Sequence, residues 1–295
     1  MHELWRARYA AEVANVSTRA RERVFWSFVV VAWNAESGLL ACLTAITNQI
    51  GIDRGDFEIV VVDNGELRVC RERLAQLADT VITTTQNVGC STGRNIGAAY
   101  ARGALLSFID DDGLVQHDYA INALKYFQDE QIVALRGRVV AHEHPYFTTL
   151  AGHYDRGPQP IEESLTAEGT MTIRAATFME CNGFPDGMVG HEGIHLSFAI
   201  RNRYPNAKII YAPDVVLEHD YMKGWHHFFA KTRCYARIDE KPCDDPRFAE
   251  FLDQQLSRRY PKISRPVDKR VARVLLVALR KSVALGVRTF SKPLS

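Results

Sequence analysis

The sequence predicts an α/β fold organised as a doubly wound layer of strands and helices, and two patterns support this. Continuous apolar runs rich in β-branched residues are typical of strands buried on both faces of a parallel sheet. Segments with helical periodicity separate these runs along the chain. The 295 residues suffice for one large or two fused domains, and 46% apolar with 24% charged residues excludes a disordered or fibrous protein.

The expected elements follow one another in a regular order in the first half of the chain. Strands are predicted at 24–32, 57–63, 80–84 and 104–110, with helices at 39–50, 68–78 and 92–102. After residue 140 the alternation weakens. There the patterns predict a loop at 142–160, a strand at 169–174, a helix from about 192, two strands at 207–211 and 215–219, and helices at 225–237 and 267–290.

Cysteine usage and the N-terminus bear on the compartment. The six cysteines form no C-x-x-C pair and no compact framework, which is typical of free thiols in a reducing compartment. The first residues carry charges of both signs and lack the apolar core of a signal peptide. No uncharged apolar stretch approaches the roughly 20 residues of a membrane-spanning helix. We therefore expect a cytoplasmic protein, with the possibility of peripheral attachment to the inner face of the membrane.

Positive charge is concentrated at the C-terminus. Residues 255–295 contain eleven Lys/Arg and one acid, a formal charge of +10, so that the remainder carries −9 and the whole chain +1. At 100° per residue, six cations of the helix 267–290 fall within an arc of roughly 120°. This helix either binds an anionic lipid surface or docks on its own chain with its apolar face buried. The six cations are Lys269, Arg270, Arg273, Arg280, Lys281 and Arg288.

Polar residues end three of the buried runs, where ligands of open α/β sheets bind. These ends are Ala32-Trp33-Asn34, Asp63-Asn64-Gly65 and Asp110-Asp111-Asp112. Three adjacent carboxylates repel one another, and a hard divalent cation with oxygen ligands relieves the repulsion. A continuing strand would place Asp110 and Asp112 on one side. The alternative is a solvated acidic turn.

Two further segments carry candidate chemistry. Asn87, Gly89 and Arg94 belong to a glycine-punctuated loop that enters a helix, where backbone amides favour an anion, although a plain helix cap explains the same pattern. Its spacing matches neither a dinucleotide fingerprint nor a P-loop. His191 and Glu192 start a later helix, where Glu192 is either a general base or an acid favoured by the helix dipole.

In this order and spacing, the motifs resemble the GT-A glycosyltransferases of glycosyltransferase family 2. The resemblance rests on Trp33-Asn34, the 60–65 run, Asn87-x-Gly89 with Arg94-Asn95-x-Gly97, Phe108 to Asp112, and Glu192 with Leu196-Ser197. It covers roughly residues 24–237 and implies a GT-A domain with a nucleotide-binding half (24–140) and an acceptor half (141–237). An N-terminal arm (1–23) and a basic helical extension (238–295) would flank it.

The resemblance implies an EC 2.4 enzyme that transfers a sugar from a nucleotide diphosphate donor, commonly UDP-linked, to an acceptor hydroxyl with inversion. The acceptor would be a saccharide or a lipid-linked saccharide, and nucleic acid is not expected as a partner. The donor-binding residues implied are Ala32, Trp33, Asn34, Asp63, Asn87, Gly89, Arg94, Asp110 and Asp111. The metal, Mn²⁺ or Mg²⁺, would be bound by Asp112, with His219 at the position of a late histidine that completes the site in some members; on residue type alone, His219 is also consistent with a surface histidine.

Two departures from the family pattern affect these roles. The proline that usually precedes the aromatic-Asn pair after the first strand is absent, and the acidic pair Glu-Asp is Glu192-Gly193 here. Because the Asp is commonly the base, the base becomes Glu192 itself or His191. On the acceptor side the aromatic and basic helix supplies Trp225, His226 and Arg233. A core-packing role is the alternative for this helix, above all for its two phenylalanines.

Two other functions fit part of the pattern. The run from Phe108 to Val115 also resembles the D-x-D-G-T strand end of haloacid-dehalogenase-type phosphatases, which would use Asp110 and Asp112, but Leu114 replaces the Thr. That motif also normally opens its fold. A nucleotide-sugar-binding protein that has lost its base is the second alternative, because Gly193 lacks a side chain.

Overall fold

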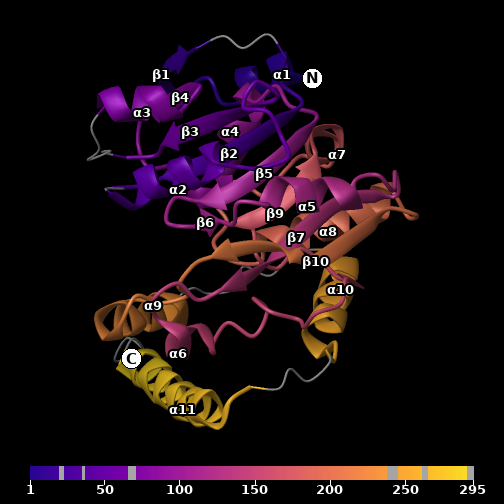
Figure 1. Cartoon of the computed structure of the whole chain (residues 1–295). Coiled ribbons are helices and arrows are strands. Elements are labelled where there is room, and N and C mark those ends of the chain that lie inside the picture. The colour runs from indigo at the N-terminus through magenta and orange to yellow at the C-terminus, as the bar shows by residue number, and fades with distance from the viewer. Residues whose placement is uncertain (20–22, 35–36, 66–70, 238–244, 261–264, 291–295) are drawn as a thin grey trace. The chain divides into compact units, whose positions relative to one another are not determined.

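The computed structural model describes residues 1–19, 23–34, 37–65, 71–237, 245–260 and 265–290, which form two compact units (Figure 1). The start of the helix predicted from residue 68 and the side chain of Arg288 lie outside this description. The predicted division at residues 23 and 237 stays a prediction. The first unit comprises Met1–Arg138 and Pro158–Leu217, and the second comprises Val139–Gly157 and Glu218–Ser295.

A ten-stranded mixed sheet organises the first unit. Its strands lie in the order β1-β4-β3-β2-β5-β9-β7-β10-β6, with β8 paired to β10. All seven residues of β3 are buried, as are six of the seven in β2, which confirms the predicted buried strands. The parallel part consists of β4 (Thr80–Thr84), β3 (Phe57–Asp63), β2 (Trp26–Ala32) and β5 (Leu105–Asp110).

Helices connect the parallel strands, as the alternating pattern predicts. They are α2 (Ser37–Thr47), α3 (Arg71–Leu77) and α4 (Cys90–Tyr100). Helix α4 lies directly against β2 because two of its residues have no side chain. A Cβ atom on Gly97 would lie 2.3 Å from Cγ1 of Val29, and one on Gly93 would lie 2.8 Å from Cγ1 of Val31. The close approach places the N-terminus of α4 at the carboxyl end of the sheet.

The second half of the sheet contains antiparallel strands. Strand β9 pairs antiparallel with both β5 and β7. The two strands predicted at 207–211 and 215–219 are wrong, because β10 (Lys208–Glu218) is continuous through Pro213. The other elements here are β6 (Leu114–Val115), α5 (Tyr119–Tyr126), β7 (Ile132–Val140), β8 (Ile161–Glu162), β9 (Thr170–Arg174), α7 (Ala175–Glu180) and α8 (Glu192–Arg203).

The N-terminal residues, for which the sequence predicts only an arm, are part of the first unit. Helix α1 (His2–Arg8) contributes Trp5 to the core, where its ring lies 5.7 Å from that of Phe178. Strand β1 (Val13–Thr18) pairs antiparallel with β4 and forms the edge of the sheet. Burial of Trp5 and Tyr9 therefore ties the chain start to the sheet.

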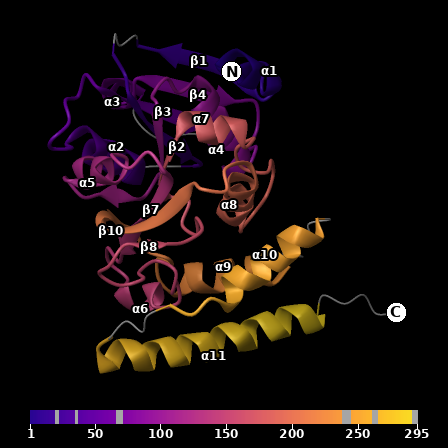
Figure 2. The same cartoon turned by 90° about the vertical axis from the view of Figure 1, so that its right-hand side faces the viewer.

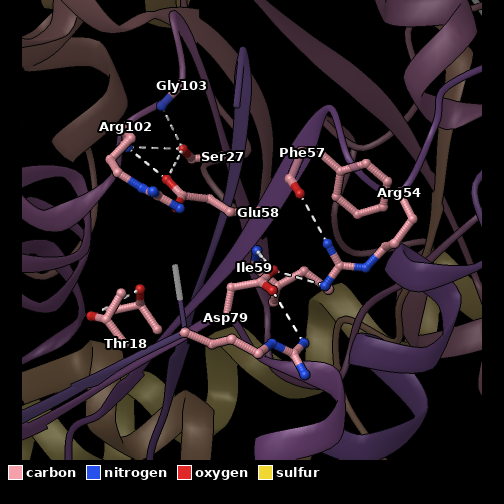
Figure 3. Close-up of polar contacts among 11 residues, drawn as sticks. Thr18, Ser27, Arg54, Phe57, Glu58, Ile59, Asp79, Arg102 and Gly103 are labelled. Carbon is pink, nitrogen blue, oxygen red and sulfur yellow. Dashed lines mark hydrogen bonds and ion pairs between the residues drawn. The ribbon is translucent and has the colours of Figure 1, made fainter. Parts of the chain in front are cut away.

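Two buried carboxylates are fully hydrogen-bonded on the parallel part of the sheet (Figure 3). Glu58 accepts from Ser27 Oγ at 2.7 Å and from Arg102 Nη2 at 2.7 Å. Asp79 accepts from the backbone N of Ile59 at 2.9 Å and from Arg54 Nη2 at 2.7 Å. Because buried charges are costly unless paired and hydrogen-bonded, we assign these two acids a structural role.

Helices dominate the second unit. Phe147, Leu150, Met222, Phe228 and Leu276 form its core. Burial of Phe228 confirms the core role expected for it. Figure 2 shows the long helix α11 beside α9, which it contacts, and it also contacts α6. No described helix is long and apolar enough to cross a membrane. The helices are α6 (Pro145–Thr148), α9 (Trp225–Arg237), α10 (Pro246–Ser257) and α11 (Val267–Phe290).

Helix α11 has two opposite faces. Leu276 is buried in the core of the unit, and Arg273 Nη1 donates to the carbonyl oxygen of Thr149 at 3.0 Å. The other face carries an exposed apolar stripe. The expectation that docking on the chain buries the apolar face is therefore correct for Leu276 and wrong for the stripe. The stripe consists of Val267, Val271, Val274, Leu275 and Leu285, each more than half exposed.

Candidate functional site

Loops that follow β2, β3 and β5 meet at the carboxyl end of the parallel strands. The Trp33 side chain is 60% exposed, and its indole lies over Gly65, where a Cβ atom would be 2.5 Å from Cδ1 of Trp33. The backbone N of Trp33 donates to Asp111 Oδ2 at 3.4 Å. The structure therefore brings Trp33 beside the ends of the other two strands. An exposed indole next to carboxylates is suited to stack a nucleotide base above a ribose.

Asp63 and its neighbour Asn64 join the end of β3 to the loop before α4. Asp63 is mostly buried and accepts from the backbone N of Gly65 at 3.3 Å. Asn64 Nδ2 donates to Asn87 Oδ1 and to the carbonyl of Gly89, both at 3.2 Å. Gly89 caps α4 with a φ of 81°, a left-handed conformation that favours glycine. These bonds hold two of the predicted donor-binding residues beside Asp63.

Ala32 and Asn34 occupy different environments on either side of Trp33. Ala32 is fully buried and lies opposite Asp63 in the parallel register of β2 and β3. Asn34 is exposed and has a φ of 50°, which turns the chain out of the sheet immediately after the strand. The carbonyl oxygen of Ala32 accepts from Asn64 N at 2.9 Å, and the assignment of Ala32 to donor binding stays a prediction.

The acidic run does not continue β5. The strand ends at Asp110, and Gly113 N donates to the Asp110 carbonyl at 2.9 Å to close a turn that contains Asp111 and Asp112. The expectation that strand alternation places Asp110 and Asp112 on one side is therefore wrong. The turn still leaves all three acidic residues near the carboxyl end of the parallel strands.

Arg94 is buried and holds Asp110. Its Nη2 atom lies 2.8 Å from Asp110 Oδ1, and its Nη1 atom lies 3.6 Å from Glu192 Oε1. Only 7% of the Arg94 side chain is exposed. The guanidinium thus joins the end of β5 to the start of α8, and its assignment to a donor diphosphate stays a prediction.

The carboxylate oxygens of the turn are the kind of ligand that a hard divalent cation prefers. Asp111 and Asp112 are partly exposed and follow a strand end. Burial raises the pKa of the Cys42 thiol, and the charges of Asp111, Asp112 and Asp110 raise it further. The electrostatic potential at the carboxyl end of the strands is therefore negative. Among described residues, no group of three or more His, Cys, Asp and Glu side chains forms a metal site by itself. A cation here would take its remaining oxygen ligands from water or from a bound molecule.

The start of α8 presents the two residues predicted for proton transfer. His191 is exposed and adopts a φ of 62°, and the helix begins at the next residue. Glu192 is 7% exposed, and its Oε2 atom is buried without a hydrogen-bond partner. An unpartnered buried carboxylate oxygen is costly in a structural role. This observation favours a functional role for Glu192.

Sequence reasoning missed a second carboxylate at this position, that of Glu168 in the loop before β9. Glu168 Oε1 accepts from the backbone N of Gly193 at 2.9 Å. Burial raises the pKa of Glu168 to about 7, and the neighbouring charge of Glu192 contributes to the increase. The one signal in the sequence is the glycine at 193, where a side chain is expected.

The remaining predicted residues belong to the second unit. His219 follows β10, and its Nδ1 atom lies 3.1 Å from the Tyr154 hydroxyl. Trp225 and His226 are exposed on α9, where the Trp225 ring meets the edge of Phe147 at 5.1 Å. Arg233 is exposed and lies over the Phe229 ring. A shared metal site for Asp112, in the first unit, and His219 stays a prediction.

The chain is similar to two proteins named as glycosyltransferases and to one named for teichoic acid biosynthesis. It is 33% identical over 87 residues to an uncharacterized glycosyltransferase of Haemophilus influenzae, covering 29% of each chain. It is 29% identical over 218 residues to the putative glycosyltransferase EpsH of Bacillus subtilis, covering 72% of this chain and 58% of EpsH. The match to the minor teichoic acid biosynthesis protein GgaB of Bacillus subtilis, at 28% identity, covers 36% of this chain and 12% of GgaB. The chain thus spans less than two thirds of each relative.

Solved structures show the same fold. S. aureus TarS 1–349 in complex with UDP-GlcNAc superimposes with a TM-score of 0.57 at 16% identity, covering 88% of this chain and 81% of TarS 1–349. The mannosyltransferase PcManGT from Pyrobaculum calidifontis in complex with GDP-Man and Mn²⁺ gives a TM-score of 0.56 at 18% identity, covering 99% and 83%. These likenesses confirm the predicted GT-A fold with C-terminal helices. The family model described as "Glycosyl transferase family 2" matches residues 27–183, more than half of the chain, and the protein belongs to that family.

Proposed function

We propose that this protein is a metal-dependent inverting glycosyltransferase that moves a sugar from a nucleotide diphosphate donor, of the UDP class, to a hydroxyl of a saccharide. The main support is the meeting of an exposed Trp33 with Asp63 and Asp111 at the carboxyl end of the parallel strands. Neighbours of the same fold are bound to UDP-GlcNAc or to GDP-Man with Mn²⁺. Fold alone does not identify the donor, so the UDP class rests on the family resemblance.

In this proposal the donor lies across the three strand ends. Trp33 stacks on the base, and Asp63 with the backbone of Ala32 and Asn34 binds the base and ribose. Asn87 and Gly89 present the start of α4 toward the diphosphate, where backbone amides favour an anion. Asp110 and Asp111 contact the nucleotide, and Arg94 fixes Asp110 through their 2.8 Å ion pair.

The metal would be held by Asp112, with His219 as a further ligand. A bound Mg²⁺ or Mn²⁺ supplies Lewis-acid stabilisation of the charge that develops on the leaving diphosphate. Asp112 provides a hard oxygen ligand in a partly exposed turn.

Proton transfer is assigned to the start of α8. As the acceptor oxygen attacks the anomeric carbon, its proton passes to a base, and the bond from that carbon to the diphosphate oxygen breaks. Glu192, with its unpartnered oxygen, and His191 are the residues there that the sequence predicts. Attack opposite the leaving group inverts the anomeric configuration.

The acceptor is proposed to meet the second unit. Trp225, His226 and Arg233 are exposed on one helix and combine a ring with polar donors, which suits a sugar. Helices α9 and α11 also enclose a pocket of about 280 Å³ lined by Tyr221, Thr232, Tyr235 and Arg280 among others. We assign this side to a saccharide or lipid-linked acceptor.

We also propose that α11 binds an anionic lipid surface. Every residue of its apolar stripe is more than half exposed, and Arg270 and Lys281 are exposed on the same helix. An apolar face flanked by cations is typical of helices that lie in a membrane interface. Each cation near the surface contributes about 1 kcal/mol. This attachment would bring the enzyme to a lipid-linked acceptor.

Turnover with candidate donors tests the proposed reaction. The protein is incubated with UDP-GlcNAc, UDP-glucose or GDP-mannose and Mn²⁺, and release of nucleoside diphosphate is measured with water or added saccharides as acceptor. We expect release from at least one UDP-sugar and its loss in Asp63→Asn. Hydrolysis of p-nitrophenyl phosphate without any donor cleavage would contradict the proposal and favour the phosphatase.

A binding protein without turnover is the second candidate, and Gly193 is the observation that favours it. Such a protein binds UDP with metal yet releases nothing from any donor. The phosphatase has less support, because Asp110–Asp112 lie inside the region that matches glycosyl transferase family 2.

A further inference from the structure

Gly193 is a glycine because a carboxylate from another segment occupies the space of its side chain. A Cβ atom at 193 would lie 2.5 Å from Glu168 Oε1 and 2.7 Å from the Leu165 carbonyl oxygen. Real Cβ atoms do not approach other atoms so closely. The same Glu168 oxygen accepts from Gly193 N at 2.9 Å. The volume beside Glu192 where a side chain would start therefore holds the carboxylate of Glu168.

The Glu168 loop also lies against the strand end that the donor proposal uses. Asp110 N donates to the Gly169 carbonyl at 3.4 Å, and a Cβ atom on Gly169 would lie 2.0 Å from Asp110 Oδ2. Glu168 is thus adjacent in sequence to the residue that touches Asp110. Its carboxylate, that of Glu192 and the Arg94 guanidinium lie within one group of interacting charges.

We propose that Glu168 supplies the carboxylate missing at position 193 and takes the proton of the acceptor hydroxyl, with Glu192 beside it. This rests on the proposed glycosyl transfer. The acceptor O–H bond breaks and its proton bonds to a Glu168 oxygen. The acceptor oxygen bonds to the anomeric carbon, and the electrons of the broken carbon–oxygen bond leave on the diphosphate. The oxygen that serves is Oε2, because Oε1 is held by Gly193 N.

The electrostatics of the pair suit this role. Burial raises the pKa of Glu168 to about 7, the charge of Glu192 raises it, and Arg94 lowers it. Cys90 and Asp110 are the other ionisable groups of this cluster. A base is most effective when its pKa lies near the working pH. Glu192 therefore acts as the neighbour that keeps Glu168 basic, with its unpartnered Oε2 available to share the proton.

A carboxyl titration tests the pair without any substrate. Protein labelled with ¹³C at glutamate carboxyls is titrated by NMR as wild type, Glu168→Gln and Glu192→Gln, with the exposed Glu162→Gln as matched control. We expect one glutamate with a midpoint near pH 7 that disappears in Glu168→Gln and moves to lower pH in Glu192→Gln. Persistence of that midpoint in Glu168→Gln, or its absence from wild type, overturns the proposal.

Turnover of the donor that the screen selects, with water as acceptor, then tests catalysis. Glu168→Gln should lower kcat at least about 100-fold while the Kd for UDP stays unchanged and the melting temperature does not fall. Glu168→Asp should retain the acidic limb of the pH profile at reduced kcat. Glu192→Gln should shift that limb to lower pH. Wild-type kcat in Glu168→Gln contradicts the role, whereas UDP binding that fails in wild type contradicts the proposed function instead.

Discussion

The guanidinium of Arg94 lies between the carboxylates of Asp110 and Glu192 and forms an ion pair with each of them. We expect Arg94→Met to lower the free energy of unfolding by about 2 kcal/mol, because it leaves two carboxylates without their common cation. The figure is below that of a fully buried pair, since Asp110 is 35% exposed. Chemical denaturation measures the change.

The control for this substitution is Arg73→Met, which removes an exposed arginine from α3. It should change the free energy of unfolding by less than about 0.5 kcal/mol. Equal effects of the two substitutions would show that the Arg94 ion pairs do not stabilise the fold.

The raised pKa of Glu168 predicts a pH-dependent stability effect. Because burial holds the folded pKa near 7, above the ordinary value of 4.5, the folded protein binds more protons than the unfolded chain between these values. Stability is therefore lost as the pH rises through this window. Glu168→Gln should be more stable than wild type at pH 8, by on the order of 2 kcal/mol, with little difference at pH 4.

Thermal unfolding from pH 4 to pH 8 measures this difference. Glu162→Gln, the exposed control, should follow the wild-type profile at every pH. A Glu168→Gln profile parallel to that of wild type would contradict an elevated pKa of Glu168.

Residue identity alone predicts the strand-end residues of the candidate site but not this carboxylate. Trp33, Asp63 and Asp110–Asp112 end apolar runs, and strand ends are local features that sequence patterns reveal. Glu168 lies in an irregular loop, and it meets Gly193 only through the tertiary fold. The same limit applies to Arg94, whose pairing with Asp110 depends on the packing of α4 against the sheet.

At the scale of elements, the contact between α4 and β2 requires glycine. Gly97→Ala should lower the free energy of unfolding by about 2 kcal/mol, because the new Cβ would lie 2.3 Å from Val29 Cγ1. Gly286→Ala is the matched change in α11, where a Cβ meets nothing within 4 Å. It should stabilise the protein by up to about 1 kcal/mol through helix propensity. Denaturation curves in which both changes have the same sign would contradict this packing.

Element prediction succeeded where burial is two-sided and failed where tertiary contacts decide. Strands β2, β3 and β5 are continuous apolar runs, so the hydrophobic pattern and the residue composition both predict a buried strand. Strand β10 continues through Pro213, because Asn122 and Tyr126 of α5 hold the next residue, Asp214, by hydrogen bonds of 2.9 and 2.6 Å. Strand β1 lies at the sheet edge and has no fully buried residue, so its sequence carries no run of buried residues.

At the scale of the whole molecule, the proposed role of α11 is to bind a lipid surface. Sedimentation with phosphatidylglycerol-containing vesicles should capture the wild type at low salt. The double substitution Val274→Asp/Leu275→Asp should reduce the bound fraction at least about tenfold, because it places charge in the apolar stripe. Leu256→Asp, at an exposed leucine of α10, is the control and should bind as wild type. Unchanged capture of the double variant would contradict attachment through the stripe.

The most direct measurement of the central claim is a calorimetric titration of UDP, with and without Mn²⁺, into wild type, Trp33→Ala, Asp112→Asn and the exposed control Asp253→Asn. We predict Mn²⁺-dependent binding by wild type and Asp253→Asn. Trp33→Ala should weaken UDP binding by about 1–3 kcal/mol while its metal dependence remains, and Asp112→Asn should lose that dependence. Absence of UDP and GDP binding by the wild-type protein, with Mn²⁺ present, would contradict a nucleotide-sugar site at the strand ends.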